Sequence, residues 1–583
     1  MKESFGRLEF ECGIECEVKE SVKKNQAGAE IHTFLINWDY EKVEKDTEIT
    51  IQLKEDAVGH MYKWHPLCGF DRSVTRGWFP AQESMTSISA PISSIFDGNG
   101  RNTFTCAVSE VKEVVDLKTA IVGNNRFAMV LKIKLAQYIK CGHLELKLLI
   151  DETDIPMYKA IDNVRIWWEE ECGLKPMPVP SDAKDAMYSY WYSFQQELFQ
   201  EPVLEEAERV KELGLKTVIL DDGWQMEGHG VRYAYTGDWQ VSEKKFSDFA
   251  GTIDKLHDMG LKVILWIALP YLGEKSELWD RFKDKVIQHS APAWASILDP
   301  RYPEVREYLI DTLKRIMNDY NPDGFKLDFI DLFYDVEDSK ISDEMDYLSV
   351  QDAVNRLMTD VKSELLKVNP DSLIEFRQKY IGPCMRTFGN MFRVEDCPDN
   401  YMINKIGVLD LRLLSGDTAV HSDMLMWNEN ESVEIAALQI INIIFGTMQF
   451  SGKLSELSDE HKRMVKFWIR FMDEYKDLLL NAPIIVEEPQ LLYTAARTEK
   501  NGESAIAVYS NDKCITLNPD MHKNVIINGT ERERIVIEAT EAVRFNMRVL
   551  NCFGEVVKTE SISLDSGIKS LDVPVSGIII LEK

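Results

Sequence analysis

Between about residue 185 and residue 450 the chain repeats one local pattern. An amphipathic helix is followed by a Gly or Asn-Pro that ends it, and then by a short apolar strand whose last residues are acidic or aromatic. The clearest helices are predicted over 204–213, 249–259, 305–320 and 354–368. Successive parallel strands need a crossover of about a dozen residues, which such helices provide. The pattern therefore predicts a parallel sheet flanked by helices.

We expect eight strands in this region, which is the number that closes a (β/α)8 TIM barrel. The predicted strands are 186–192, 216–220, 262–265, 325–331, 372–377, 391–395, 409–414 and 443–450. An open doubly wound sheet is the alternative. It is disfavoured because no GxGxxG motif follows the first strand and because acidic strand ends recur around the whole series.

Short strand-like runs separated by turn residues occupy both ends of the 583-residue chain. A Pro-rich stretch at 175–182 and an Asn-Ala-Pro sequence at 481–483 separate these ends from the central region. We therefore predict an α/β protein of three domains. These are an N-terminal β-sandwich over 1–175, a catalytic barrel over 176–482 and a C-terminal antiparallel β domain over 483–583.

The charge and cysteine content limit the partners and the compartment. Asp plus Glu number 97 against 67 Lys plus Arg, a net charge of −30 at pH 7, which disfavours nucleic acid and anionic membrane surfaces as partners. The first residues lack the apolar run of a secretory signal, and the ten cysteines show no CxxC spacing. We expect a cytoplasmic protein with reduced thiols and no transmembrane helix.

The acidic strand ends are the candidate chemical groups, because barrel enzymes carry their active sites at the carboxyl ends of the strands. Ten His without an HExxH motif and the absence of GxSxG disfavour metal hydrolysis and a serine nucleophile, so no metal and no cofactor is expected. Lys326 and Asp328 are two apart on one predicted strand and should share a face. A lysine there would keep Asp328 ionised as a nucleophile, and a purely structural ion pair is the alternative.

Several short runs occur in the same order along the barrel as in a known family. They are Tyr190-Trp191-Tyr192, Asp221-Asp222-Gly223-Trp224, Trp266, Lys326-Leu327-Asp328 and His421-Ser422-Asp423-Met424-Leu425. With the two flanking β domains, the chain resembles the α-galactosidases of glycoside hydrolase family 36. The resemblance covers most of the chain, and its most specific motifs lie within 190–425.

The resemblance implies a retaining mechanism through a covalent glycosyl-enzyme, with Asp328 as the nucleophile. It assigns the acid/base role to Asp396 after the sugar-binding Arg393, although the two are three apart here and four apart in relatives. Glu395 and Asp417 therefore remain open as alternatives to Asp396. The other implied sugar contacts are Asp221, Asp222, Trp191, Trp224, Trp266, Lys326 and Asp423. Glu375 and Arg377, two apart on one strand, are predicted to brace the site from behind.

The implied substrate is a small carbohydrate with a terminal α-galactosyl residue, and Asp221 and Asp222 would accept hydrogen bonds from its 4-OH and 6-OH. The alternatives are an α-N-acetylgalactosaminidase, a raffinose-synthase-like transglycosidase, a family 31 α-glucosidase and a non-catalytic carbohydrate-binding protein. Because relatives often oligomerise, the sandwich domain could form an interface between copies of the chain in a homo-oligomer.

Overall fold

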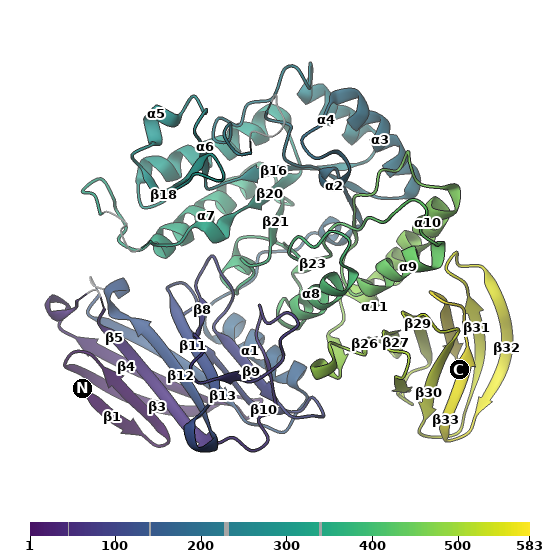
Figure 1. Ribbon diagram of the computed structural model, residues 1–583, viewed down its shortest axis with the longest axis horizontal. Helices are drawn as coiled ribbons and strands as arrows, with labels where there is room; N and C mark the ends of the chain where they lie inside the picture. Colours follow the sequence, from purple (N-terminus) through teal and green to yellow (C-terminus); the bar gives the residue numbers. More distant parts are fainter. Residues whose placement is uncertain (45, 139–140, 227–231, 337–340) are drawn as a thin grey trace.

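The computed structural model describes residues 1–44, 46–138, 141–226, 232–336 and 341–583. Figure 1 shows a helix-rich central region with one β domain at its lower left and another at its lower right. None of the helices within these ranges is long and apolar enough to cross a bilayer. The ten cysteines all lie within them, and none forms a disulfide there.

The N-terminal region is a sandwich of two sheets, whose facing sides share one apolar core that includes Ile51, Met129, Phe34 and Phe104. The first sheet has the order β1-β2-β5-β12-β11-β7 with β8 beside β11, and the second has the order β3-β4-β13-β10-β9-β6. The strands are β1 (Lys2–Phe5), β2 (Leu8–Cys12), β3 (Cys16–Lys24), β4 (Glu30–Trp38), β5 (Glu48–Asp56), β6 (Tyr62–Trp64), β7 (Thr75–Arg76), β8 (Gln82–Ser84), β9 (Ile92–Phe96), β10 (Asn102–Val108), β11 (Val115–Val122), β12 (Arg126–Lys134) and β13 (His143–Asp151). Helix α1 (Met157–Glu171) then leads toward the central region.

In the central region, eight strands within the described ranges pair side by side in parallel. In chain order they are β14 (Met187–Ser189), β15 (Thr217–Leu220), β16 (Lys262–Ala268), β20 (Gly324–Asp328), β21 (Leu373–Arg377), β22 (Met391–Arg393), β23 (Ala419–His421) and β24 (Gln449–Phe450). Strand β14 pairs with both β15 and β24, and a parallel bridge between His421 and Thr447 joins β23 to the last segment. The sheet therefore closes into the predicted barrel.

The helices of this region within the described ranges are α2 (Trp191–Phe194), α3 (Gln200–Leu213), α4 (Phe249–Asp258), α5 (Trp279–Phe282), α6 (Pro303–Tyr320), α7 (Val350–Val368), α8 (Tyr401–Leu414), α9 (Val433–Asn442), α10 (Asp459–Glu474) and α11 (Lys476–Leu480). Between β16 and α6 the chain forms a small antiparallel sheet of β17 (Tyr271–Gly273), β18 (Val286–Ser290) and β19 (Ala295–Leu298). The four helices expected from the periodicity correspond to α3, α4, α6 and α7.

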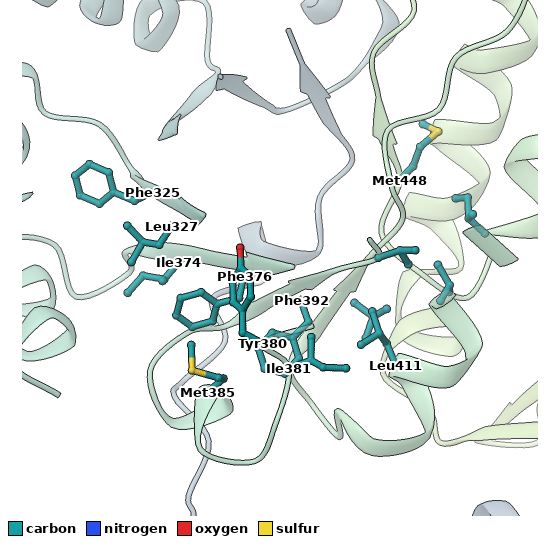
Figure 2. Close-up of a cluster of buried hydrophobic side chains, with 14 of the residues drawn as sticks. Phe325, Leu327, Ile374, Phe376, Tyr380, Ile381, Met385, Phe392, Leu411 and Met448 are labelled. Atoms are coloured by element: carbon teal, nitrogen blue, oxygen red, sulfur yellow. The ribbon is translucent and has the colours of Figure 1, made fainter. Parts of the chain in front are cut away.

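Alternate residues of each barrel strand face opposite sides. On β20, Phe325 and Leu327 belong to the apolar layer that also holds Ile374, Phe376 and Phe392 (Figure 2). The intervening Lys326 and Asp328 carry the polar contacts described below. The amino-terminal part of the barrel interior is filled by a separate apolar cluster of Met187, Ile219, Ile264, Leu373, Met391 and Ala419. Lys326 and Asp328 therefore lie toward the carboxyl end of the barrel, beyond this apolar cluster.

Three predicted strands are wrong in position or type. The first strand ends at Ser189, and Trp191–Phe194 forms the short helix α2. Aromatic residues favour a strand only where their side chains can pack against residues of neighbouring strands. The seventh prediction, 409–414, lies in α8, where nearly every residue is buried and no polar face reveals a helical period. The actual seventh strand is β23, only three residues long. The eighth is the short β24 after a turn.

The C-terminal region contains two further sheets around a core that includes Ile506, Ile526 and Ile579. Their orders are β25-β26-β27-β29-β34-β31-β32 and β28-β30-β33, mostly antiparallel with one parallel pair in each. The strands are β25 (Ile484–Glu487), β26 (Ala495–Lys500), β27 (Glu503–Val508), β28 (Cys514–Thr516), β29 (Lys523–Asn528), β30 (Arg534–Ala539), β31 (Val543–Leu550), β32 (Val556–Leu564), β33 (Gly567–Asp572) and β34 (Ile578–Glu582). The sandwich sheets end before residue 175, the parallel sheet lies within 187–450, and the C-terminal sheets begin at Ile484. This division supports domain limits that we propose near residues 175 and 482.

Candidate active site

Asp328 is the last residue of β20 and is almost fully buried, with 7% of its surface exposed. Its Oδ1 accepts hydrogen bonds from Arg377 Nε at 2.7 Å, from the Tyr380 hydroxyl at 2.9 Å and from the Phe329 backbone N–H at 2.8 Å. Its Oδ2 accepts one hydrogen bond, from Trp266 Nε1 at 3.0 Å. One carboxylate oxygen is therefore crowded with donors, whereas the other keeps a free lone pair.

The charges around Asp328 keep it ionised. Burial alone would raise the pKa of this carboxyl, but Arg377, Lys326 and the Trp266 hydrogen bond together hold it well below its ordinary value. The sequence suggested Lys326 as the cation nearest to Asp328. In the structure the nearest cation is Arg377, 2.7 Å from the Asp328 carboxylate. Arg377, predicted with Glu375 to brace the site, does so by binding the carboxylate of the candidate nucleophile.

Lys326 instead forms a buried ion pair with Asp221, which follows β15, at a distance of 2.7 Å between Nζ and Oδ2. The next residue, Asp222, accepts hydrogen bonds from the side-chain amides of Gln196 at 2.7 Å and Gln225 at 2.8 Å. Burial raises the pKa of Asp222 to about 6, with a further contribution from Asp221 against the effect of the two amides. The two neighbouring aspartates thus have different electrostatic roles.

Arg393, the last residue of β22, connects the remaining predicted carboxylates. Its guanidinium donates to Asp396 Oδ1 at 2.7 Å and to Asp423 Oδ1. Asp423 is fully buried, and its Oδ2 also accepts from the Tyr192 hydroxyl at 2.9 Å and the Cys397 backbone N–H at 2.6 Å. Asp423 therefore orients Arg393 from the side away from solvent.

The Asp396 side chain is half exposed. Its remaining burial would raise the pKa of this carboxyl, but Arg393, Lys326 and Arg377 lower it overall, whereas Asp328 acts in the opposite direction. Asp396 and Asp328 are therefore close enough for each to feel the charge of the same three cations. Asp396 is a carboxylate in this arrangement.

The two alternatives to Asp396 lie elsewhere. Glu395 follows the end of β22, so the regular alternation that would have set it beside Arg393 has already stopped. Its side chain is exposed, and its backbone N–H donates to Gln378 Oε1 at 3.0 Å. Asp417 is exposed in the turn that precedes β23, at the amino end of the barrel strands. Asp396, in contrast, shares Arg393, Lys326 and Arg377 with Asp328.

The three predicted tryptophans are placed differently. Trp266 contacts Asp328 directly. Trp191 lies on α2, partly exposed. Trp224 is fully buried, stacks on Phe249 with 13° between the rings and donates to the Trp266 carbonyl at 3.1 Å. Trp224 therefore supports Trp266 from behind instead of forming an exposed wall.

Four aromatic residues near Asp328 were not predicted. Tyr233 stacks on Tyr271 with 4.8 Å between ring centroids, Phe329 packs edge-on against Tyr233 at 5.2 Å, and the Tyr380 hydroxyl contacts Asp328. Phe329 has φ +64°, a left-handed conformation that costs a bulky residue about 1–3 kcal/mol. The only sequence signal was their position after strands, because single aromatic residues give no periodicity.

Other features bear on cofactors. Within the described ranges, no group of three or more His, Cys, Asp or Glu side chains has a metal-binding arrangement.

Glu375 lies inside the barrel, where burial raises its pKa; it accepts a hydrogen bond from Gln449, and its Oε1 lies 3.7 Å from Arg393 Nε.

Comparisons with known proteins agree with this architecture. Residues 181–395 match the Melibiase family model, which confirms the resemblance of the barrel to family 36 α-galactosidases. Two curated relatives are the bifunctional α-galactosidase/sucrose kinase AgaSK of Mediterraneibacter gnavus, 29% identical over 172 residues, and the A type blood α-D-galactosamine galactosaminidase of Flavonifractor plautii, 25% identical over 177 residues. These alignments cover 28% and 26% of this chain but only 18% and 16% of the two relatives.

Structural similarity extends over the whole chain. The crystal structure of the GH36 α-galactosidase AgaA from Geobacillus stearothermophilus superimposes with a TM-score of 0.62 at 13% identity, covering 99% of this chain and 83% of that one. At this identity the similarity establishes the fold. It confirms a barrel flanked by β domains.

Proposed function

We propose that this protein is a retaining glycoside hydrolase that removes terminal α-D-galactosyl residues from small α-galactosides, with Asp328 as nucleophile and Asp396 as acid/base. The observation that carries the proposal is the environment of Asp328, a carboxylate kept ionised at the end of a barrel strand, whose Oδ2 accepts one hydrogen bond and keeps a free lone pair. The Melibiase match over the same barrel supports the choice of sugar.

The proposed reaction has two steps. In the first, Asp328 Oδ2 attacks the anomeric carbon while Asp396 gives a proton to the glycosidic oxygen, so that one C–O bond forms as the other breaks. In the second, Asp396 takes a proton from water, the water oxygen attacks the same carbon, and Asp328 leaves as a carboxylate. Two inversions at one carbon retain its configuration.

Asp396 must gain a proton before the first step, although Arg393 lowers its pKa in the free protein. A sugar that covers the half-exposed Asp396 carboxyl would remove its remaining water, and desolvation raises the pKa of a carboxyl. In the glycosyl-enzyme, Asp328 no longer carries a negative charge. The pKa of Asp396 then falls, which suits its second role as a base.

Replacing Asp396 by alanine should affect substrates according to their leaving groups. Asp396→Ala should slow hydrolysis of natural α-galactosides by about 10²–10⁴-fold, the usual contribution of a general acid. Aryl α-galactosides with acidic phenols should lose far less in the first step, because the phenolate departs without protonation. The measurement is kcat/KM on both substrates, which reports the first step, with Glu395→Gln as the control. Equal losses of kcat/KM on both substrates in Asp396→Ala would contradict this assignment.

Asp222 should produce an acidic limb in the pH profile. Its pKa of about 6 means that it becomes protonated as pH falls through 6 and then loses its capacity as a charged acceptor of sugar hydroxyls. We expect kcat/KM to fall below about pH 6 and the limb to disappear in Asp222→Asn, which should also be weaker overall. A limb unchanged in this variant would assign it to another group.

The substrate itself is tested with a panel of p-nitrophenyl glycosides. We expect turnover of the α-galactoside well above that of the α-glucoside, which tests the family 31 alternative. The Flavonifractor relative favours, as a second candidate, an enzyme for 2-amino or 2-acetamido α-galactosides. Turnover of the α-N-acetylgalactosaminide alone would support that candidate. Transfer to added sucrose would indicate a transglycosidase, and no turnover of any glycoside would contradict the proposal.

A further inference from the structure

A loop of the N-terminal sandwich is buried against the barrel. This sandwich loop, residues 85–90, connects β8 to β9, and it contains Thr86, Ser87 and Ser89, all of which are 1% exposed or less. Polar side chains and backbone groups are seldom buried without partners. Thr86 bonds to the Lys112 carbonyl within the sandwich, and the partners of this loop in the barrel lie on the segments that follow β20 and β21.

The first set of contacts involves the segment after β20. The Ser87 hydroxyl donates to the Phe333 carbonyl at 3.0 Å, and the Ser87 backbone N–H donates to Gln351 Oε1 at 3.3 Å. Gln351 itself donates to the same Phe333 carbonyl at 2.7 Å. The sandwich loop thus fixes the chain five residues beyond Asp328.

The second set involves the segment after β21, residues 378–382, here named the β21 loop. The Ser89 backbone N–H donates to the Lys379 carbonyl at 2.8 Å. Gly382 approaches the Ser89 carbonyl so closely that a Cβ added at 382 would lie 2.2 Å from that oxygen. The two loops are therefore in backbone contact, with no space for a side chain between them.

The β21 loop in turn contacts both segments that carry the proposed catalytic carboxylates. The Tyr380 hydroxyl donates to Asp328 Oδ1 at 2.9 Å. The Gln378 backbone N–H donates to the Arg393 carbonyl at 3.0 Å, and its side-chain oxygen accepts from the Glu395 backbone N–H at 3.0 Å. Figure 2 shows Tyr380 in the buried cluster with Phe376, Ile381 and Met385, so its ring has little freedom to move.

We propose that the sandwich loop is a positioning element of the active site: by holding the β21 loop, it sets the hydrogen bond from Tyr380 to Asp328 and the separation of Asp328 from Asp396. This inference rests on the proposed glycosidase function. The Tyr380 bond occupies Oδ1 together with Arg377 and Phe329, and it therefore selects Oδ2 as the attacking oxygen. Ser89 and Gly382 act through Tyr380 and do not contact the sugar.

The test compares Gly382→Ala with Tyr380→Phe and with the double variant, using an aryl α-galactoside and a natural disaccharide. Each single variant should lower kcat about tenfold on both substrates, with KM changed less than about threefold, because a misplaced nucleophile slows attack whatever the leaving group. If Gly382 acts through Tyr380, kcat of the double variant should be no lower than kcat of the less active single variant. Asp396→Ala, in contrast, should discriminate between the substrates.

Two further variants keep the result interpretable. Gly98→Ala in the N-terminal sandwich, outside the sandwich loop, is the control, since its Cβ would have only an ordinary contact of 3.8 Å, and it should keep parental kcat. Ser87→Ala removes the hydroxyl that holds the sandwich loop to the Phe333 carbonyl, while Gln351 still bonds to Phe333, so the variant should fold. Because the same loop holds the β21 loop through Ser89, we expect a loss of about threefold in kcat. Circular dichroism and thermal unfolding establish that each variant is folded.

Parental kcat in folded Gly382→Ala and Ser87→Ala would overturn the positioning role, as would losses that multiply in the double variant. These outcomes differ from a failure of the proposed function, in which the parent protein itself would not hydrolyse any glycoside of the panel.

Discussion

Asp328→Asn should lose nearly all turnover, about three orders of magnitude or more in kcat, and added azide should restore part of it. An asparagine keeps the size of the side chain and one accepting oxygen, but its NH2 group cannot accept the Trp266 hydrogen bond and it is a far poorer nucleophile than a carboxylate. Azide can occupy the vacated side of the sugar and attack the anomeric carbon itself. The measurement is turnover of an activated aryl α-galactoside with and without azide, together with identification of the galactosyl azide.

Asp335→Asn is the matched control, because Asp335 is an exposed aspartate on the segment that follows the same strand. It should retain parental kcat. Turnover of Asp328→Asn within about tenfold of the parent would show that another residue is the nucleophile, and a structural role for the Lys326–Asp328 face would then be the better interpretation.

Asp410→Asn should destabilise the folded protein by about 3–5 kcal/mol, because it leaves a buried charge without its counter-ion. Asp410 on α8 accepts hydrogen bonds from Arg72 at 3.0 Å and from Trp64 Nε1 at 2.9 Å, and Tyr493 also donates to it. Trp64 and Arg72 belong to the N-terminal region, and Tyr493 to the C-terminal one. Each region therefore contributes to one buried cluster.

The change in unfolding free energy is measured from urea unfolding followed by tryptophan fluorescence and circular dichroism. Asp56→Asn is the control, since Asp56 pairs with Arg126 on the surface and such pairs contribute at most about 1 kcal/mol. The double variant Arg72→Met with Asp410→Asn should recover much of the loss, because it removes both charges while the asparagine oxygen still accepts from Trp64 and Tyr493. A loss below about 1 kcal/mol in Asp410→Asn would contradict the importance of this cluster.

The barrel could be predicted because its signal is repeated. Four helices with a clear polar face and strands such as Lys262–Ala268 alternate, and a Gly or Asn-Pro ends each helix. A wrong prediction for one strand therefore does not change the predicted fold. Errors occurred where burial removes that signal. Helix α8 is apolar on nearly all sides, and β23 is too short to show any alternation.

The position of the candidate site could be predicted for similar reasons. Residues at the ends of successive parallel strands must converge, so Asp221, Asp328 and Arg393 lie at the same end of the barrel. Their individual partners could not be predicted. Whether Lys326 or Arg377 is closer to Asp328 depends on side-chain conformations that the strand period does not determine.

The contribution of the N-terminal region to the site could not be seen in the sequence at all. Ser89 and Lys379 are far apart along the chain, and neither belongs to a motif. Their contact follows from how the sandwich docks on the barrel, and docking depends on complementary surfaces and not on local periodicity. Contacts of this kind arise only when the two domains fold against each other.

The central claim, that Asp328 forms the covalent intermediate, is tested most directly by trapping that intermediate. A 2-deoxy-2-fluoro or 5-fluoro α-galactosyl fluoride slows the second step relative to the first, so the glycosyl-enzyme accumulates. After proteolysis, mass spectrometry should locate one added fluorosugar on Asp328. A label on Asp396 or another carboxylate, or product formation with inverted anomeric configuration, would contradict the mechanism.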